Sequence, residues 1–188
     1  EGGEWPPRHK SREEALQVMA NLARGHAAAY RALHAADHQD ADGDGAAALV
    51  GFAQHLTIFD PLNAWKPLDV LTAGFNEKVF DRAPLLAMTT GKLQFTIPGA
   101  RGVTGFDPRG ASACDWVGVN YYTRWMCDAG GKPERVAKPG APLTGMGWED
   151  YPEGMYRALK LADEYTKLPD GLLVPIIITE NGVDDRVG

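Results

Sequence analysis

Apolar positions in the first third of the chain predict a helix followed by a strand. Residues 11–36 place leucine, methionine, alanine and aromatic side chains near helical spacing, while charged side chains fall on the opposite side. Ser11 followed by Glu14 is the signature of a capping box, which marks the start of the helix. After a polar loop at 37–45, residues 47–57 predict a strand, so we expect the helix to pack with one face on a sheet.

The same alternation continues along the chain. In order, the further elements are a helix over 68–88 that Pro84 can interrupt, an extended segment at 93–98, a strand at 116–122, a helix over 152–165 and a strand at 173–179. The stretch 98–112 is rich in glycine and proline and predicts a loop. Helices that alternate with strands indicate an α/β fold with a parallel sheet. Because no repeat or linker divides the chain, we expect one domain over residues 1–188.

One carboxylate stands where such a sheet places reactive groups. Residues 175–182 read Pro-Ile-Ile-Ile-Thr-Glu-Asn-Gly, and their β-branched run is typical of a strand buried on both faces. Glu180 ends that run, and the Asn-Gly pair that follows is a turn signal. Barrels of parallel strands carry catalytic groups at the C-terminal strand ends, which makes Glu180 a candidate. A structural glutamate beside a solvated turn is the alternative that this segment leaves open.

Two further segments narrow the choice. Residues 115–124 read Asp-Trp-Val-Gly-Val-Asn-Tyr-Tyr-Thr-Arg, and residues 148–154 read Trp-Glu-Asp-Tyr-Pro-Glu-Gly. With the Thr-Glu-Asn-Gly run, in this order and spacing, they resemble the motifs of family 1 glycoside hydrolases, the retaining β-glucosidase family. The resemblance covers essentially the whole chain and implies a portion of a (β/α)8 TIM barrel, with strands five to seven present and strands one to four and eight lacking. A complete barrel typically needs about 250 residues, more than this chain has.

The resemblance also implies a set of site residues. Glu180 would be the nucleophile of a retaining β-glycosidase, which attacks the anomeric carbon and forms a covalent glycosyl-enzyme. Tyr122 would donate a hydrogen bond to it, and Asn120, two residues earlier on the same strand face, would bind substrate. Trp125 and Trp148, expected on loops beyond strand ends, would contact the sugar. For Tyr122 and both tryptophans, packing of the protein itself is the alternative.

The partner of the nucleophile is not found in these residues. The family carries its acid/base carboxylate in an Asn-Glu-Pro motif, and Glu1 is followed by Gly-Gly. The resemblance implies that the parent protein hydrolyses terminal β-linked glucosides or related β-glycosides. The isolated chain is expected to be inactive and to need the missing barrel portion, in cis or as another chain. The alternative is a truncated, non-catalytic carbohydrate-binding or interaction module that needs a partner chain.

Composition and charge exclude several other classes. With 44% hydrophobic and 23% charged residues, the composition is that of a globular protein, and a net charge of −6 does not favour nucleic-acid or membrane partners. No apolar run approaches the length of a transmembrane helix. Cys114 and Cys127 do not make a disulfide framework, so we expect two core residues and a reducing, cytoplasmic location.

Two patterns imitate metal sites without completing them. Residues 40–45 resemble the start of an EF-hand loop, but the twelfth position is Gly51 where a bidentate glutamate is needed. His34 and His38 are spaced to share a helix face, but the glutamate of a His-Glu-x-x-His motif is lacking. Their place at a helix end suits the helix dipole instead. We expect neither a metal nor an organic cofactor.

Overall fold

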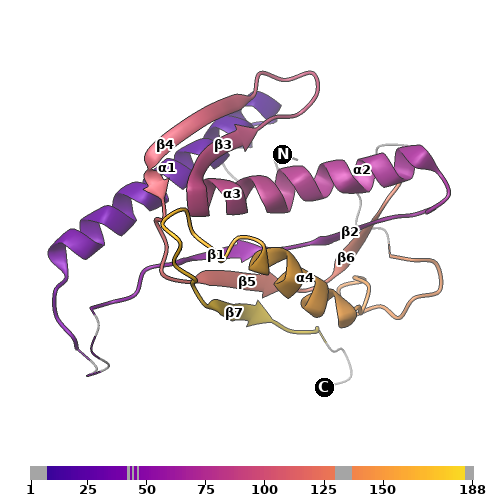
Figure 1. Ribbon diagram of the computed structural model, residues 1–188. Helices are drawn as coiled ribbons and strands as arrows, with labels where there is room; N and C mark the ends of the chain where they lie inside the picture. Colours follow the sequence, from indigo (N-terminus) through magenta and orange to yellow (C-terminus); the bar gives the residue numbers. More distant parts are fainter. Residues whose placement is uncertain (1–7, 42, 44, 46, 130–136, 185–188) are drawn as a thin grey trace.

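A three-stranded parallel sheet organises the chain (Figure 1). The computed structural model describes residues 8–41, 43, 45, 47–129 and 137–184. The strands are β1 (Phe52–His55), β5 (Val117–Tyr121) and β7 (Ile176–Asn181), and they pair in the order β1–β5–β7. The expected α/β fold with parallel strands is confirmed.

Two of these strands continue into a second parallel pair. The strand expected over 47–57 is shorter than predicted, because β1 covers only 52–55, and β2 (Ile58–Pro61) follows it after two residues, beyond the expected range. It pairs in parallel with β6 (Arg124–Cys127), which follows β5 in the same way. The prediction that 124–127 form a loop was therefore wrong, and Trp125 lies in a strand. The register joins Phe59 to Trp125, so the pairing comes from a segment more than 60 residues away, which local sequence does not reveal.

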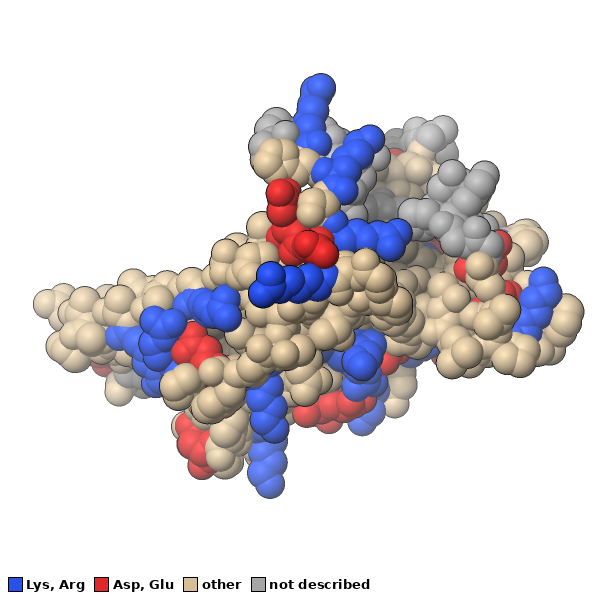
Figure 2. Space-filling model, turned by 90° about the horizontal axis from the view of Figure 1, so that it is seen from above, with Lys and Arg blue, Asp and Glu red and all other residues tan. Residues whose placement is uncertain are grey.

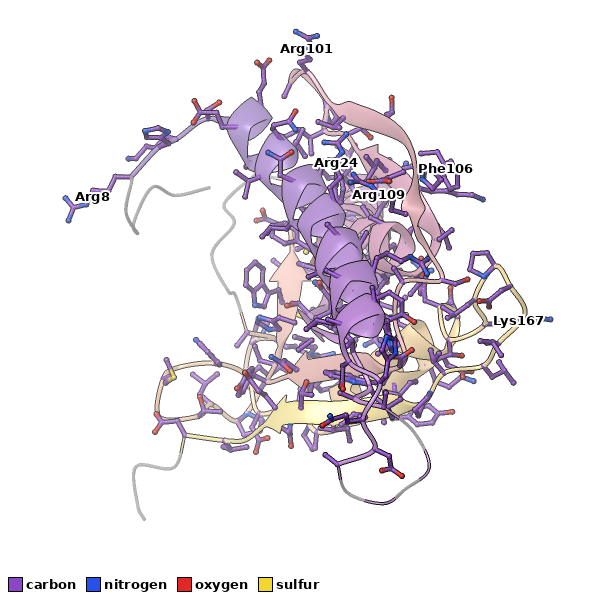
Figure 3. All side chains as sticks on the ribbon, turned by 90° about the vertical axis from the view of Figure 1, so that its left-hand side faces the viewer. Arg8, Arg24, Arg101, Phe106, Arg109 and Lys167 are labelled. Carbon is purple, nitrogen blue, oxygen red and sulfur yellow. The ribbon has the colours of Figure 1, made fainter. Side chains whose placement is uncertain are left out.

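The first helix is confirmed at its predicted position. Helix α1 (Arg12–Ala36) begins where the Ser11 hydroxyl accepts the N–H of Glu14, at 3.2 Å. Its small residues Ala20 and Ala23 are buried, which lets it lie close across the hairpin of β3 (Gly91–Phe95) and β4 (Val103–Ala111). Figure 3 shows α1 crossing this hairpin, with Arg101 at the hairpin tip.

The hairpin corrects a second prediction. Strand β4 covers most of the stretch expected to be a glycine- and proline-rich loop, and it pairs antiparallel with β3. Pro108 is compatible with β4 because a strand at a sheet edge can spare one N–H donor. The composition of the segment therefore concealed a strand whose partner is the extended segment just before it.

The second helical region is one rod with a change of winding. It consists of α2 (Pro67–Glu77), a π-helical turn η1 (Lys78–Arg82) and α3 (Ala83–Thr90). The irregular turn ends two residues before Pro84, whose missing N–H donor removes one hydrogen bond of the helix. The carbonyl of Phe80, which Pro84 cannot serve, accepts a hydrogen bond from the Gln54 side chain at 3.2 Å. This contact ties the rod to β1.

Helix α4 (Glu153–Asp163) covers the central strand β5. Gly154 is required there, because a Cβ at this position would lie 1.7 Å from the Tyr121 hydroxyl. That hydroxyl donates to the carbonyl of Tyr151 at 2.7 Å, which fixes the start of the helix on the strand. Tyr121 therefore faces the helix layer, as expected from strand alternation.

Strand β7 differs from the expectation of burial on both faces. Ile177 and Ile178 are 44% and 50% exposed, because β7 pairs with β5 on one side and forms the border of the described sheet. Figures 1 and 3 both place β7 at the lower edge of the molecule. The isoleucine run thus indicates a strand suited to burial on both faces, but the described residues do not cover both faces.

The surface and the cysteines agree with the bulk properties. On the face shown in Figure 2, basic and acidic side chains are interspersed instead of gathered into one basic field. Cys114 and Cys127 are buried and unpaired with each other. Within the described segments, no helix has the length and apolar character needed to cross a membrane.

Candidate active site

The carboxylate of Glu180 lies against the phenol of Tyr122. The Tyr122 hydroxyl donates a hydrogen bond of 2.6 Å to Glu180 Oε2. Glu180 belongs to β7, and Tyr122 directly follows β5, so both lie at the C-terminal ends of adjacent parallel strands. The hydrogen bond to this carboxylate is the main reason that the pKa of Tyr122 is raised. The structure thus brings together the two residues that the sequence predicted as nucleophile and donor.

A β-bulge sets the direction of these side chains. Val119 pairs with Ile178 and Asn120 with Glu180, so Thr179 is an extra residue in β7. Such an insertion re-aims the side chains that follow it. The Thr179 hydroxyl donates to the amide oxygen of Asn120. Asn120 is therefore held beside the bulge, two residues before Tyr122, and its contact with substrate stays a prediction.

Asn181 supports the strand end from the other side. Its side-chain N–H donates to the carbonyl of Tyr121 at 2.8 Å. Thr179 and Asn181 thus support the strand on either side of Glu180. Together the two contacts fix the end of β7 to the end of β5.

Aromatic rings line the phenol. Trp148 meets the Tyr122 ring edge-on, with 6.2 Å between centroids, and His55 meets it edge-on at 5.9 Å. Trp148 comes from a loop, as predicted. His55 was left without a role by the sequence, although its position at the end of β1, in register with Asn120, is the signal that could have identified it.

Trp125 lies in a different aromatic group. Its ring is 5.6 Å from that of Phe59 and 6.4 Å from that of Phe80. These contacts match the alternative of packing within the protein. A sugar contact for Trp125 stays a prediction.

A buried ion cluster lies beside the candidate site. Arg124 donates to Glu149 Oε1 through Nη2 at 2.6 Å and Nε at 3.0 Å, and to Asp60 Oδ2 through Nη1 at 2.9 Å. Its guanidinium lies 3.9 Å from the centre of the Tyr151 ring. On the side of the cluster that faces α4, Arg157 donates to both oxygens of Asp60 at 2.7 and 2.8 Å. Arg124 therefore forms salt bridges with both Glu149 and Asp60.

The charges in this cluster are held in their ionised forms. Burial alone would raise the pKa of Glu149, but hydrogen bonds from Arg124 and from the backbone N–H of Lys138 outweigh burial and lower it. Burial also opposes ionisation of Asp60, and the two arginines outweigh it, so the pKa of Asp60 is lowered. Both carboxylates are thus ionised and already engaged with cations.

The metal-like patterns form no complete site in the described chain. Across these residues, no group of three or more histidine, cysteine, aspartate or glutamate side chains is placed to hold a metal ion. His34 contacts Asp115 at 2.8 Å. Asp42 and Asp44 of the EF-hand-like loop lie outside the described residues. That the protein needs no metal or cofactor stays a prediction.

Comparison with known proteins gives a consistent family. No protein-family model matches the chain. A β-galactosidase of Pyrococcus woesei is 29% identical over 209 residues, which cover 96% of this chain and 38% of the relative. The solved β-glycosidase from Pyrococcus horikoshii is 31% identical with a TM-score of 0.68, over 96% of this chain and 38% of that one. A family 1 β-glucosidase from Thermotoga maritima, 24% identical with a TM-score of 0.69 over 96% of this chain and 40% of that one, supports the fold.

The matches also fix the extent of the likeness. The chain spans about two fifths of the length of the relatives that it matches. In sequence and in fold, the chain therefore corresponds to part of the TIM barrel of the family 1 β-glycosidases.

Proposed function

We propose that this chain is the nucleophile-bearing portion of a retaining β-glycosidase that hydrolyses terminal β-linked glucosides or related β-glycosides. The observation that carries the proposal is the 2.6 Å hydrogen bond from Tyr122 to Glu180 at the C-terminal strand ends. Relatives named β-galactosidase and β-glycosidase support the reaction class.

The geometry suits a carboxylate that attacks a sugar. Glu180 is exposed, and the phenol binds its Oε2, so Oε1 is the oxygen that we expect to attack the anomeric carbon. A phenol hydrogen bond restricts the rotamers that the carboxylate can adopt. Attack would release the aglycone and leave an ester between Glu180 and the sugar, which water then hydrolyses.

The reaction needs a second carboxyl group, and the neighbouring Glu149 is unsuited to that role. Retaining enzymes place the two groups about 5–5.5 Å apart, and one protonates the leaving oxygen. Glu149 is buried, and its oxygens accept hydrogen bonds from Arg124 and from Lys138 N–H, so it has no proton to give. We propose that the acid/base carboxylate comes from further sequence, in the same polypeptide or in another chain.

Strand β7 is where we expect that further sequence to pack. Isoleucines that are 44% and 50% exposed, at positions 177 and 178, suit burial under additional strands and helices. A parallel strand added beside β7 would also use its outer hydrogen-bonding groups, which an open edge leaves available. The match to about two fifths of the relatives' length supports this arrangement.

A covalent trapping experiment tests the role of Glu180. The natural polypeptide that contains these residues is treated with a β-glucoside that carries fluorine next to the anomeric carbon and dinitrophenolate as leaving group. This leaving group departs without protonation, while the fluorine slows hydrolysis of the ester. We expect the mass of one sugar on the peptide that contains Glu180, and none after Glu180→Gln.

The control and the contrary outcomes are equally defined. Glu153→Gln changes an exposed glutamate at the start of α4 and should leave the labelling unchanged. A label on any other residue would exclude Glu180 as nucleophile. Sugar binding without labelling would favour a non-catalytic carbohydrate-binding module. The 188-residue chain alone should not turn over an aryl β-glucoside.

A further inference from the structure

We propose that Arg124 and Glu149 are positioning residues for the candidate site: their buried ion pair holds Trp148 against Tyr122 and so orients the phenol that binds Glu180. The catalytic consequence of this inference rests on the proposed function, whereas its geometric part does not.

Two short segments, 122–124 and 148–149, lie against each other. Tyr122 meets Trp148 through their rings, at 6.2 Å. The hydroxyl of Thr123 donates to the carbonyl of Glu149 at 2.8 Å, and Arg124 binds the carboxylate of the same residue. Three successive residues after β5 therefore contact two successive residues of the loop, and the ion pair closes the series.

Hydrogen bonds within the loop from Lys138 to Glu149 hold it in one shape. The Glu149 carboxylate accepts the backbone N–H of Lys138 at 2.8 Å, which joins the two ends of the loop. Between them, Thr144 accepts the N–H of Trp148 on its hydroxyl at 3.3 Å and donates its own N–H to the Trp148 carbonyl at 2.8 Å. The backbone of Trp148 is thus fixed within the loop, and the residue that follows it, Glu149, is bound to Arg124.

The residue types of the Arg124–Glu149 pair suit a positioning role. The Glu149 side chain is 2% exposed and that of Arg124 is 12% exposed, so both charges are largely removed from water. A buried ion pair adds little net stability compared with apolar residues, but it accepts few alternative geometries. The planar guanidinium stacks on Tyr151 while it binds Glu149 and Asp60, which an ammonium group cannot do. This arrangement suits a role in orientation.

The orientation of the Tyr122 phenol affects the reactivity of Glu180. The Tyr122–Glu180 hydrogen bond lies in an exposed part of the surface, where an unsupported tyrosine can adopt other rotamers. The rings of Trp148 and His55 limit these rotamers. Because small displacements of a catalytic group cost much rate, loss of the loop position should slow the attack by Glu180.

The test uses the 188-residue chain labelled with fluorotryptophan and observed by fluorine NMR. Trp148→Phe identifies the Trp148 resonance. Trp116, which directly precedes β5 and packs against Gly51 just before β1, reports on the rest of the sheet. Glu149→Gln keeps the shape but weakens the pair, and Arg124→Lys keeps the charge but loses the stacked fork. We expect both to shift or broaden the Trp148 resonance and to leave that of Trp116 unchanged.

Arg157→Gln is the matched control. It removes the other arginine of Asp60, leaves Arg124 in place to compensate that charge, and has no hydrogen bond to Glu149. It should not move the Trp148 resonance. If Trp148 is unchanged in both test variants, or if Trp116 shifts to the same extent, the ion pair has no specific positioning role and the inference is wrong.

A second readout separates this inference from the proposed function. In the natural polypeptide, Glu149→Gln and Arg124→Lys should slow the labelling of Glu180 by roughly 10- to 100-fold, with Arg157→Gln near the unmodified rate. Equal rates in all forms would overturn the catalytic part of the inference. Absence of labelling in the unmodified protein would instead contradict the proposed function, and the NMR result would still decide the geometry.

Discussion

Glu180 and Glu149 are separated by only two aromatic residues in contact, Tyr122 and Trp148, yet the surroundings of the two carboxylates are opposite. Glu180 accepts one hydrogen bond, from Tyr122, whose ring contacts Trp148 next to Glu149. Glu149 is buried and accepts two bonds from Arg124 and one from Lys138 N–H. A carboxylate whose oxygens are all engaged can hold a structure together, whereas one with an accessible oxygen can react. The difference indicates which glutamate is suited to chemistry.

The largest effect is expected from leaving the buried carboxylate of Glu149 without its cation. Arg124→Met keeps an unbranched side chain but removes the charge between Glu149 and Asp60. Because an uncompensated buried charge remains, we expect the free energy of unfolding to fall by about 3–5 kcal/mol, measured by chemical denaturation. A loss below about 1 kcal/mol would mean that water reaches Glu149, and the contrast with Glu180 would disappear.

Asp81 tests what happens to a buried carboxylate without such a cation. It lies in the π-helical turn and is 0% exposed; Oδ1 accepts the N–H of Thr57 at 3.1 Å, and Oδ2 has no hydrogen-bond partner in the described structure. Burial raises its pKa well above the ordinary value of 3.8. The folded protein therefore holds this proton more tightly than the unfolded chain does.

The sign of the pH dependence follows from that difference. Since the folded-state pKa is raised, the stability is greatest below the unfolded-chain pKa and falls as the pH rises through the folded-state pKa. We expect Asp81→Asn to remove a loss on the order of 1–3 kcal/mol that develops as the pH rises from the unfolded-chain pKa through the raised folded-state pKa. Denaturation curves at several pH values measure it, with the exposed Asp163→Asn as control. Parallel pH profiles for the parent protein and Asp81→Asn would show that Asp81 is solvated.

The two regions also differ in how far the sequence predicts them. The parallel strands follow from apolar runs, and the Tyr122–Glu180 contact follows from motif resemblance, because both features are local in sequence or shared by a family. The Arg124–Glu149 pair has neither property. Its members are 25 residues apart across a loop, and many charged residues in the chain offer equivalent partners.

Strands β4 and β6 show the same limit for the fold. Each gains its hydrogen bonds from a partner strand, and neither has a strong apolar alternation of its own. Strand β7 shows the opposite case. Its isoleucines indicate burial on both faces, but sequence pattern alone cannot say whether the covering residues are present.

Removal of an exposed ion pair should cost much less stability than removal of a buried one. Arg82 binds Glu77 at 2.6 Å and Glu164 at 2.5 Å, with side chains between one third and one half exposed. Water can replace these contacts, so Arg82→Gln should lower the free energy of unfolding by about 0.2–1 kcal/mol. When both losses are measured under the same conditions, the difference between Arg82→Gln and Arg124→Met gives the effect of burial on the strength of similar ion pairs. Equal losses would mean that burial of the Arg124 cluster is not what makes it strong.

The smallest effect on stability is expected at Glu180 itself. Its only protein hydrogen bond among the described residues is on the surface, so Glu180→Gln should leave the denaturation midpoint unchanged. It should nevertheless lower the pKa of Tyr122 toward its ordinary value, because the carboxylate that raises it is gone. The chemical shift of ring-labelled Tyr122, followed with pH, measures this change, and Glu153→Gln should have no effect. In the parent chain the contribution of this bond is complete at neutral pH and is lost as the pH rises through the raised pKa. A variant that melts earlier, with an unchanged Tyr122 titration, would place Glu180 with Glu149 among the structural carboxylates.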